Sequence, residues 1–555
     1  MRAHLFKISG VSRKCWLSLA LGVVALGLSP ASAQSPRRPV GSVDKPDNKV
    51  SEVTPPLKRI ISLSGEQRSR RAAMQDICRQ AGIALRLDDE ALAAVGFKSD
   101  GPISVKITGE SLQDVLRRMI DWRAHPGVYR EVRGGAVVLT TLQATRVRTM
   151  RHLPEWLKPL HDHGLLATVD DAGGVITLTS GEVMTDELLA RLETLPKLRE
   201  LDLGATKTLT RTGMAHLGKL PALEILRLSS VIHEGEGLGD AALEAVSRIP
   251  TLLDLTIAEC GTTDAGVRHL DAMPQLTHLT LRQEGRLTDA ALASVAKLKR
   301  LRQLDLSSYV GTASYGRMRF TPEGLNQLAG LQDLEVLRLP GHAPRADLFP
   351  LPKLTSLGVG GVDDAAATRI ARCKDLRSLE LQYPDITDDG LKQIATLPGL
   401  RHLSLSSGII TDAGIAHLGA LPHLEHLELR ATGVSDETLR HLADVKTLTR
   451  LDLHGSGLPG VNLGRRFTAD GLRQLKRLPR LRTLWLTNLQ LDGGFGVLKE
   501  LTQLRELSLM MTDISEGEVA ALEEALSDTT VIAMSGAGRV GLPKGMRPGR
   551  AKSQK

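Results

Sequence analysis

One repeated pattern governs the chain from residue 198 onward. Each unit begins with L-x-x-L-x-L, passes through a short polar or glycine-containing stretch, and ends in T/S-D-x-G-L-x-x-L, as in LRHLSLSSGIITDAGIAHL (400–418) and LEHLELRATGVSDETLRHL (424–442). Thirteen such units follow one another at a mean interval of about 25 residues. A unit this short cannot bury its own apolar face, so the sequence predicts a stack of similar units around one continuous core.

The composition of the unit predicts its local structure. Leucines that alternate with outward-facing residues indicate a short strand with one buried face. The Thr or Ser that follows the turn is suited to cap a helix, and the next Asp lies in the first helical turn, where the helix dipole favours negative charge. The four clearest pairs are Thr288-Asp289, Thr387-Asp388, Thr411-Asp412 and Ser435-Asp436. Each unit is therefore expected to contain one strand and one helix.

With these motifs, residues 198–512 resemble a leucine-rich-repeat protein. The units are similar to the cysteine-containing and bacterial T-D-x-G-L subclasses, although only Cys260 stands at the cysteine position after a strand. The resemblance implies an α/β solenoid: a curved horseshoe with a parallel β-sheet on its concave face and helices on its convex face. It also implies a binding function without chemistry of its own.

Residues 1–56 have the features of a targeting segment and a linker. Residues 1–33 carry basic residues ahead of an apolar stretch and end in Ala31-Ser32-Ala33, so a Sec signal peptide is expected with cleavage after Ala33. The segment 34–56 is rich in Pro, Ser and charge, which predicts a disordered linker. No later segment approaches the length of a membrane span, so we expect a periplasmic or secreted protein without integral membrane insertion.

Residues 57–145 predict a small α/β domain ahead of the repeats. Expected strands are 61–65, 84–88, 102–109 and a hairpin over 128–141, and expected helices are 73–83 and 111–122. This order resembles the secretin and TonB short N-terminal (STN) domain, which implies a module for protein contacts. We expect residues 146–197 to form a transition and N-terminal cap, 198–534 the solenoid with a closing strand at 529–534, and 535–555 a basic disordered tail.

No motif predicts catalysis or a bound cofactor. The segment GAGRVG (536–541) matches a dinucleotide fingerprint, but Leu542-Pro543 follows where a helix should open. The triplet His161-Asp162-His163 lacks partners at zinc-like spacing and favours a turn. Cys78, Cys260 and Cys373 lie too far apart in sequence to indicate a disulfide framework and fit buried apolar positions. We therefore expect no enzyme activity, no cofactor and no resident metal.

Two repeats are lengthened by insertions at 307–320 and 454–467. Both insertions end in Arg-Phe-Thr. Phe320 and Phe467 are expected to fill the core position that Ile386, Ile410 and Val434 hold in other repeats. The rest of each insertion is a candidate partner-binding loop, because insertions in repeat arrays gather on one face. The candidate loop residues are Tyr309, Tyr315, Arg317 and Arg465.

The concave face offers a second set of candidates. The third, fifth and seventh positions of L-x-x-L-x-L-x face the hollow, and four consecutive units place charged, imidazole and indole groups there. The candidate residues are His402, His426, Glu428, Arg430, Arg450, Asp452, His454 and Trp485. Strand pairing should make His402 neighbour His426, Glu428 neighbour Asp452, and Arg430 neighbour His454.

Three interpretations of this surface stand side by side. It can be a solvated face with incidental ion pairs, or a partner-binding patch anchored by an exposed Trp485 beside arginine, the usual composition of an interface hot spot. Facing histidines with two carboxylates also permit a weak metal site.

Charge narrows the class of partner. The chain carries +8 overall, yet residues 151–535 hold 41 basic and 50 acidic side chains and carry −9. Aromatic side chains make up only 3% of the chain, which disfavours a nucleic-acid binder that stacks bases. We expect a scaffold for a basic or neutral protein, or for a cell-envelope polymer, and no nucleic acid. The alternatives are a structural envelope protein held by its basic tail and an enzyme with an unrecognised site in the insertions.

Overall fold

The computed structural model describes residues 60–541 apart from short gaps. The gaps are 64–67, 104–106, 121–127, 134–135, 142–143, 145–148, 162–164, 171, 181–182, 234–235, 283, 309–317, 319, 341–350, 383–384, 407–408, 431–434, 456–465, 493, 513 and 536–539. The chain divides into two compact units between Arg148 and Thr149. The expected signal peptide, linker and most of the tail lie outside the described residues.

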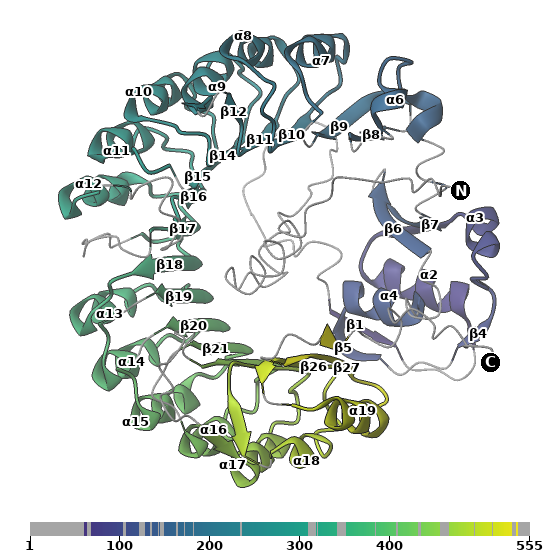
Figure 1. Cartoon of the computed structure of the whole chain (residues 1–555), viewed down its shortest axis with the longest axis vertical. Coiled ribbons are helices and arrows are strands. Elements are labelled where there is room, and N and C mark those ends of the chain that lie inside the picture. The colour runs from purple at the N-terminus through teal and green to yellow at the C-terminus, as the bar shows by residue number, and fades with distance from the viewer. Residues whose placement is uncertain are drawn as a thin grey trace, which may run out of the picture. The chain divides into compact units, whose positions relative to one another are not determined.

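The second unit is a leucine-rich-repeat solenoid. Its strands line the inner side of an arc and its helices line the outer side (Figure 1). The strands are β8 (Leu166–Val169), β9 (Val175–Ser180), β10 (Glu200–Gly204), β11 (Ile225–Ser229), β14 (Asp254–Ala258), β15 (His278–Arg282), β16 (Gln303–Asp305), β17 (Val336–Arg338), β18 (Ser356–Gly360), β19 (Ser378–Gln382), β20 (His402–Ser406), β21 (His426–Arg430), β22 (Arg450–His454), β24 (Thr483–Thr487), β26 (Glu506–Thr512), β27 (Thr530–Ser535) and β28 (Val540–Gly541).

The helices of this unit follow the strands in alternation. They are α6 (Lys158–His161), α7 (Asp186–Arg191), α8 (Arg211–Met214), α9 (Gly239–Val246), α10 (Asp264–Val267), α11 (Asp289–Val295), α12 (Pro322–Asn326), α13 (Asp364–Ile370), α14 (Asp388–Ile394), α15 (Asp412–Ala416), α16 (Asp436–Leu442), α17 (Ala469–Arg473), α18 (Phe495–Leu498) and α19 (Glu516–Ala525). Several continue into a 3-10 turn, as α15 does into His417–Ala420. Two small strand pairs, β12 (Ile232–His233) with β13 (Glu236–Gly237) and β23 (Arg466–Thr468) with β25 (Gln490–Asp492), lie outside the main sheet.

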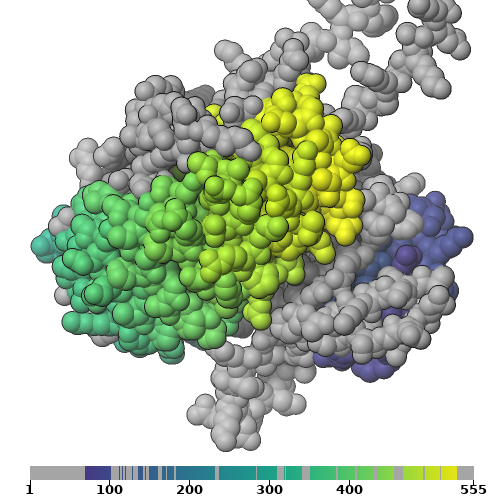
Figure 2. Space-filling view, turned by 90° about the horizontal axis from the view of Figure 1, so that it is seen from below, coloured from purple at the N-terminus to yellow at the C-terminus, as the bar shows by residue number. Residues whose placement is uncertain are grey.

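The main sheet is parallel from β9 to β27, with equivalent positions of neighbouring repeats in register. Leu403 pairs with Leu427, and Leu427 with Leu451. The thirteen predicted strands are all present, from β10 to β26. The predicted strand of the first irregular repeat is β9, and the predicted closing strand is β27. Antiparallel β8 and β28 extend the two ends. Figure 2 shows the colour passing from teal to yellow across this unit, so repeats adjacent in sequence are adjacent in space.

The leucines of the repeat form one continuous core, and the two insertion phenylalanines belong to it. Phe467 is 1% exposed and Phe320 is 7% exposed, in the same cluster as Ile386 and Ile410. The prediction that both phenylalanines occupy the core position after the insertion is confirmed. Val434, the third reference position, lies outside the described residues.

The predicted helix caps are also confirmed. The hydroxyls of Thr288, Thr387, Thr411 and Ser435 each accept a hydrogen bond from a backbone N–H in the first turn of the following helix. These residues are in extended conformation, which is the usual backbone of an N-cap.

The aspartates that follow the caps have a role that the local pattern does not reveal. Each lies at the start of a helix and accepts two hydrogen bonds from the cap residue of the next repeat, one from its N–H and one from its hydroxyl. We call each such pair an aspartate rung. The rungs are Asp186 to Thr210, Asp240 to Thr263, Asp264 to Thr288, Asp289 to Thr321, Asp364 to Thr387, Asp388 to Thr411, Asp412 to Ser435 and Asp436 to Thr468.

The aspartate rung explains the glycine of the T-D-x-G motif. A Cβ atom added at Gly414 would stand 2.1 Å from Oδ1 of Asp388, the carboxylate of the preceding repeat. In the repeat of α16 this position is Thr438, and its side chain joins the rung instead: its hydroxyl and its N–H both donate to Oδ1 of Asp412. The motif thus encodes contact between repeats as well as helix initiation.

The first unit contains three small sheets and three described helices. They are β1 (Ile60–Leu63) with β5 (Ile107–Ser111), β2 (Arg68–Ser69) with β4 (Pro102–Ile103), and β3 (Ala84–Leu87) with β7 (Ala136–Thr141) and β6 (Val128–Arg133), together with α2 (Arg70–Gln80), α3 (Asp89–Ala94) and α4 (Leu112–Ile120). Its core packs Met74 and Ile77 of α2 against Leu116 of α4 and Leu139 of β7.

Three features of this unit differ from the sequence prediction. The short strand β2 was not expected. The single strand expected over 102–109 is two strands, β4 and β5, which pair with different partners. The helix α3 was not expected, because it is too short to show a helical period. It starts where the Asp88 side chain accepts the N–H of Ala91, while the other Asp88 oxygen accepts the Thr140 hydroxyl.

Candidate functional site on the concave face

Strand register brings the predicted residues of β20, β21 and β22 together. His402 is opposite His426, Glu428 is opposite Asp452, and Arg430 is opposite His454. All three predicted neighbour pairs are confirmed. The His402 and His426 rings meet edge to face, with centroids 5.8 Å apart and planes at 88°. We use the name concave cluster for His402, His426, Glu428, Arg430, Arg450, Asp452, His454 and Trp485.

Each carboxylate of the concave cluster is bound by an arginine two positions away on its own strand. Arg430 approaches Oε1 of Glu428 at 2.5 Å, and Arg450 approaches Oδ2 of Asp452 at 2.8 Å. Ser404 donates its hydroxyl to the second Glu428 oxygen at 2.9 Å. Asp452 is 2% exposed, so its charge depends on these partners for compensation.

Two of the three histidines in the concave cluster, His426 and His454, lie diagonally against the carboxylates. Nε2 of His426 is 3.3 Å from Oδ2 of Asp452, and Nε2 of His454 is 3.5 Å from Oε1 of Glu428. Burial, reinforced by the positive charge of Arg430, lowers the pKa of His454. Burial works against ionisation of Asp452 too, but His426 and Arg450 outweigh it and hold the pKa of that carboxyl below its ordinary value. His454 is therefore neutral at pH 7 and Asp452 is ionised.

Trp485 closes the cluster on β24, opposite Asp452. The Arg450 guanidinium lies over the indole ring at 4.0 Å from its centroid, and the indole N–H donates to Glu506 at 2.9 Å. The prediction of an exposed Trp485 beside arginine needs correction, because the ring is half-buried and one face is covered. A cation stacked on an indole in this way is worth about 0.5–2 kcal/mol, so Trp485 and Arg450 form one rigid element.

The surface becomes less polar beyond Trp485. The central row continues from Trp485 to Ser508 and Ile532, and the next row pairs Thr487 with Met510. Met510 and Ile532 are half-buried. The concave cluster is thus a balanced charge network with an apolar border toward the C-terminal end of the sheet.

The candidate loop residues of the two insertions, Tyr309, Tyr315, Arg317 and Arg465, lie outside the described residues. Their role stays a prediction.

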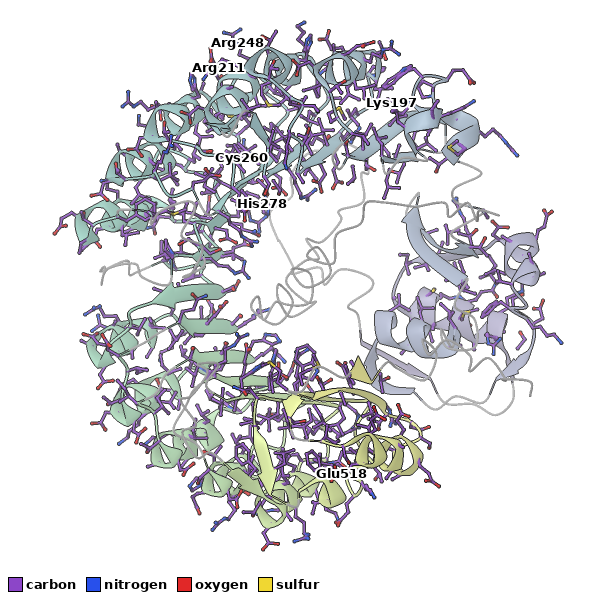
Figure 3. The ribbon with its side chains drawn as sticks, in the orientation of Figure 1. Lys197, Arg211, Arg248, Cys260, His278 and Glu518 are labelled. Carbon is purple, nitrogen blue, oxygen red and sulfur yellow. The ribbon has the colours of Figure 1, made fainter. Side chains whose placement is uncertain are left out.

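A second polar arrangement on the concave face was not found from the sequence. Arg282 binds Oδ2 of Asp305 at 2.6 Å, and Arg338 lies 4.0 Å from the same oxygen. Burial opposes ionisation of Asp305, but Arg282 outweighs it and lowers the pKa of the carboxyl. A single Asp between two arginines gives no sequence signal, since both partners stand on other strands, in the repeats before and after it. Figure 3 shows His278 on this inner side, whereas Arg211 and Arg248 lie on the outer, helical side.

Glu284 is a further buried acid that the sequence did not single out. It is fully buried, and its two oxygens accept the backbone N–H groups of Cys260 and Thr262 in the preceding repeat. Burial raises the pKa of its carboxyl to about 7. Glu284 holds the turn after Cys260 in place, which is a structural role.

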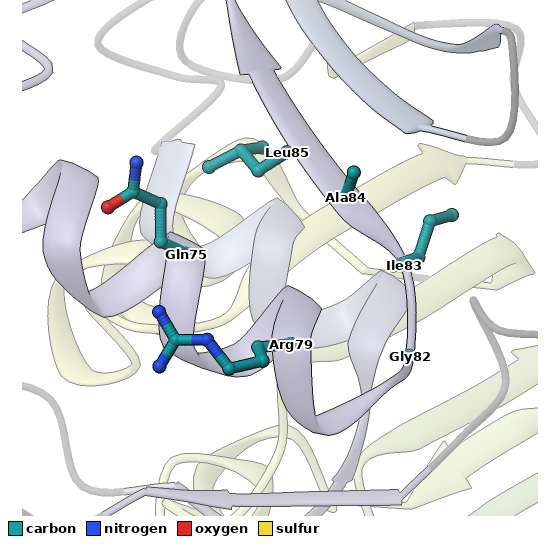
Figure 4. A pocket seen from close by; sticks show the side chains of 6 residues that line it. All are labelled: Gln75, Arg79, Gly82, Ile83, Ala84 and Leu85. Carbon is teal, nitrogen blue, oxygen red and sulfur yellow. The ribbon is translucent and has the colours of Figure 1, made fainter.

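The first unit carries a shallow pocket of about 460 Å³ between α2 and the start of β3. Figure 4 shows Gln75 and Arg79 extending from the helix, with Ile83, Ala84 and Leu85 across from them. Arg79 is largely exposed and pairs with Asp76. The lining mixes polar and apolar groups without a buried charge, so the pocket defines no ligand.

The remaining sequence candidates show no site. His161 ends α6, whereas Asp162 and His163 lie outside the described residues. Val540 and Gly541 of the glycine-rich segment form the short strand β28. Cys78 and Cys260 are buried, Cys373 is half-buried, and all three are free thiols. In the described part of the chain, no helix is both long and apolar enough to cross a bilayer.

No protein-family model matches the chain, and no curated relative matches it. Solved structures align with it at low identity. An internalin, InlF, of Listeria monocytogenes is 18% identical over 64% of this chain and 86% of its own, with a TM-score of 0.39. The leucine-rich-repeat protein LIC12759 of Leptospira interrogans is 20% identical over 62% of this chain and 80% of its own, with a TM-score of 0.35. TLR13 in its complex with ssRNA13 is 19% identical over 61% of this chain and 43% of its own, with a TM-score of 0.34. The fold assignment rests on the register and repeat of this chain itself.

Proposed function

We propose that this protein is a non-enzymatic binding scaffold of the bacterial cell envelope that recognises a protein partner through the concave cluster. One observation carries the proposal: Arg450 is stacked on Trp485 at the border of the concave cluster, where the neighbouring charges are already paired. Tryptophan and arginine fixed in this way are the residues that most often dominate binding energy in protein interfaces.

The charge of the solenoid favours a basic or neutral partner. Residues 151–535 carry −9, and a long acidic surface attracts basic partners and repels nucleic acid. The half-buried Met510 and Ile532 beside Trp485 offer apolar area to a protein surface. An envelope polymer is the competing ligand. It would use the same hydrogen-bonding groups but would gain little from the methionine and isoleucine.

The proposed location in the envelope rests on the sequence of residues 1–33, with its basic start, apolar stretch and small-residue cleavage site. The resemblance of the first unit to the STN domain supports a second contact with another envelope protein.

The test is capture of a partner from native envelope extract with the intact chain, followed by purification of that partner and titration. Replacing both Trp485 and Arg430 by alanine should weaken the purified complex about tenfold or more, as hot-spot residues do. Arg450→Ala should also weaken it.

A matched control is available in the N-terminal cap of the solenoid. Arg191 also lies over an indole ring, that of Trp156, at 6.0 Å. Arg191→Ala should leave the affinity unchanged. If the Trp485 and Arg430 double variant binds the partner as tightly as the parent protein does, the concave cluster is not the binding site.

A further inference from the structure

We propose that Glu428, Asp452 and His454 form a binding site for a divalent transition-metal ion, with Zn²⁺ as the best match. The three residues come from the adjacent strands β21 and β22 and face the hollow. One ligand atom from each lies within 4.8 Å of the other two. The site lies within the concave cluster and adds a ligand class that partner binding does not require.

The spacing of the ligand atoms suits a small ion. Nε2 of His454 and Oε1 of Glu428 are 3.5 Å apart. Two ligands of a tetrahedral zinc ion with bonds of ~2.1 Å lie ~3.4 Å apart. The third ligand, a carboxylate oxygen of Asp452, lies within 4.8 Å of the other two ligand atoms and must move closer to complete three corners of that tetrahedron. A side-chain rotation can supply this, because the strands already hold the residues in adjacent rows.

An unsatisfied nitrogen points to the ion independently of spacing. Nε2 of His454 is buried and has no hydrogen-bond partner in the described part of the chain, although a carboxylate oxygen faces it. A buried polar atom without a partner is uncommon in native proteins and calls for an ion, a water or a functional role. A metal ion between Nε2 and the Glu428 oxygen would satisfy both atoms.

The surrounding groups would serve as supports for metal ligands. Ser404 holds the second Glu428 oxygen, and His426 contacts Asp452 at 3.3 Å. Hydrogen bonds of this kind orient ligating carboxylates and raise metal affinity.

Arg430 and Arg450 oppose metal binding, because both bind the same carboxylates. The Arg430 side chain is 29% exposed, so its guanidinium can swing toward the hollow when the metal takes its place, whereas Arg450 stays stacked on Trp485. Metal entry is therefore an exchange of one cation for another. Removing Arg430 should strengthen metal binding.

The donor set selects among metals. One imidazole and two carboxylates supply three protein ligands, the number in zinc sites that leave a fourth position for water. Ca²⁺ needs six to eight oxygen ligands and Mg²⁺ keeps most of its own water, so both should bind far more weakly. Co²⁺ is a spectroscopic substitute, because tetrahedral coordination gives it strong visible absorption.

The experiment is calorimetric titration of the intact chain with Zn²⁺, paired with visible spectra after Co²⁺ addition. The parent protein should bind one Zn²⁺ in excess of the His454→Gln variant, and that variant should lose both the site and the tetrahedral Co²⁺ spectrum. Glu428→Gln, a conservative change at a partly exposed residue, should weaken Zn²⁺ binding about tenfold or more. Arg430→Met should strengthen it.

The matched control is His278→Gln on β15. His278 also faces inward beside a carboxylate, that of Asp254, but lies outside the cluster, so its loss should change neither stoichiometry nor spectrum. The proposal is overturned if the parent and the folded His454→Gln and Glu428→Gln variants bind Zn²⁺ alike, or if the parent binds none. Arg430→Met separates the two proposals, since it should weaken partner binding while it strengthens metal binding.

Discussion

Asp388 joins its repeat to the next through Thr411, whose N–H donates to Oδ1 at 2.9 Å and whose hydroxyl donates to Oδ2 at 2.6 Å. The same hydroxyl accepts the N–H of Ala413 and caps α15. One threonine therefore starts its own helix and holds the preceding one, so helix initiation in one repeat depends on the repeat before it.

The hydrogen bonds of an aspartate rung should contribute more to the stability of the protein than the interaction of the same aspartate with the helix dipole. Asp388→Ala removes two hydrogen bonds to a charged acceptor, which should lower the free energy of unfolding by about 1–3 kcal/mol. Asp389→Ala is the control, because Asp389 lies in the same first turn but outside the rung, and should cost less than about 1 kcal/mol. Urea unfolding measures both. If the two variants lose the same free energy of unfolding, Asp388 stabilises the protein only through the helix dipole.

The glycine of the motif should tolerate a methyl group only at a cost. Gly414→Ala would place a Cβ 2.1 Å from Oδ1 of Asp388, so the two helices must shift apart, as they have at Ala291, which holds the same motif position in α11 beside the intact rung from Asp264 to Thr288. Stability should fall by about 1–2 kcal/mol. Gly419 lies in the 3-10 turn after the same helix, with nothing within 4 Å of its Cβ position. Gly419→Ala should be neutral or stabilising by up to about 1 kcal/mol. Thermal unfolding of the two variants measures the difference. A Gly414→Ala variant as stable as the parent protein would contradict the close approach of Asp388.

Glu284 should make stability depend on pH near neutrality. The pKa of its carboxyl is raised by burial from 4.5 to about 7 in the folded protein, so between these values the folded state holds a proton that the unfolded chain has released. The contribution of Glu284 to the free energy of unfolding is therefore largest below pH 4.5. It falls by on the order of 3 kcal/mol as the pH rises through 7.

The Glu284→Gln variant isolates this effect. Glutamine cannot titrate and can accept only one of the two N–H groups of Cys260 and Thr262, so it should be less stable than the parent at low pH. The difference should shrink as pH rises from 5 to 8. Urea unfolding across that range gives the slope, and a constant difference between parent and variant would contradict the raised pKa.

The cysteines should react slowly while the protein is folded. Burial raises the pKa of the Cys78 and Cys260 thiols to about 12 and that of Cys373 to about 11, so at pH 8 very little thiolate is present to act as a nucleophile. Iodoacetamide labelling followed by peptide mass spectrometry should modify half-buried Cys373 first and Cys260 only after addition of urea. Rapid native labelling of Cys260 would show that the turn next to Glu284 opens readily.

The strand register could be predicted because it follows from leucine spacing alone. Once Leu427 and Leu451 are aligned, Glu428 must face Asp452, and this held in the structure. The direction in which a long side chain extends over its neighbours on the same face could not be predicted in the same way. Arg450, and not Arg430, covers Trp485, because the conformation of a long flexible side chain depends on its neighbours and not on the alternation of the strand.

The aspartate rung was missed for a different reason. Asp388 and Thr411 are separated by 23 residues, and each has a sufficient local explanation as a helix-start residue. The available signal was their shared spacing with Gly414. A glycine inside a helix costs about 1 kcal/mol relative to alanine, so its recurrence two positions after an aspartate indicates a close tertiary contact at that position.

The aspartate rungs also separate the length of a repeat in sequence from its length in space. Asp364 reaches Thr387 across 23 residues, and Asp289 reaches Thr321 across 32, with the same two hydrogen bonds at nearly the same distances. Chain added after the strand therefore leaves the stacking of the helices unchanged. Such a scaffold can acquire new loops by insertion without a new fold. The one requirement is that each added segment ends in a Thr or Ser that can donate to the rung aspartate of the preceding repeat.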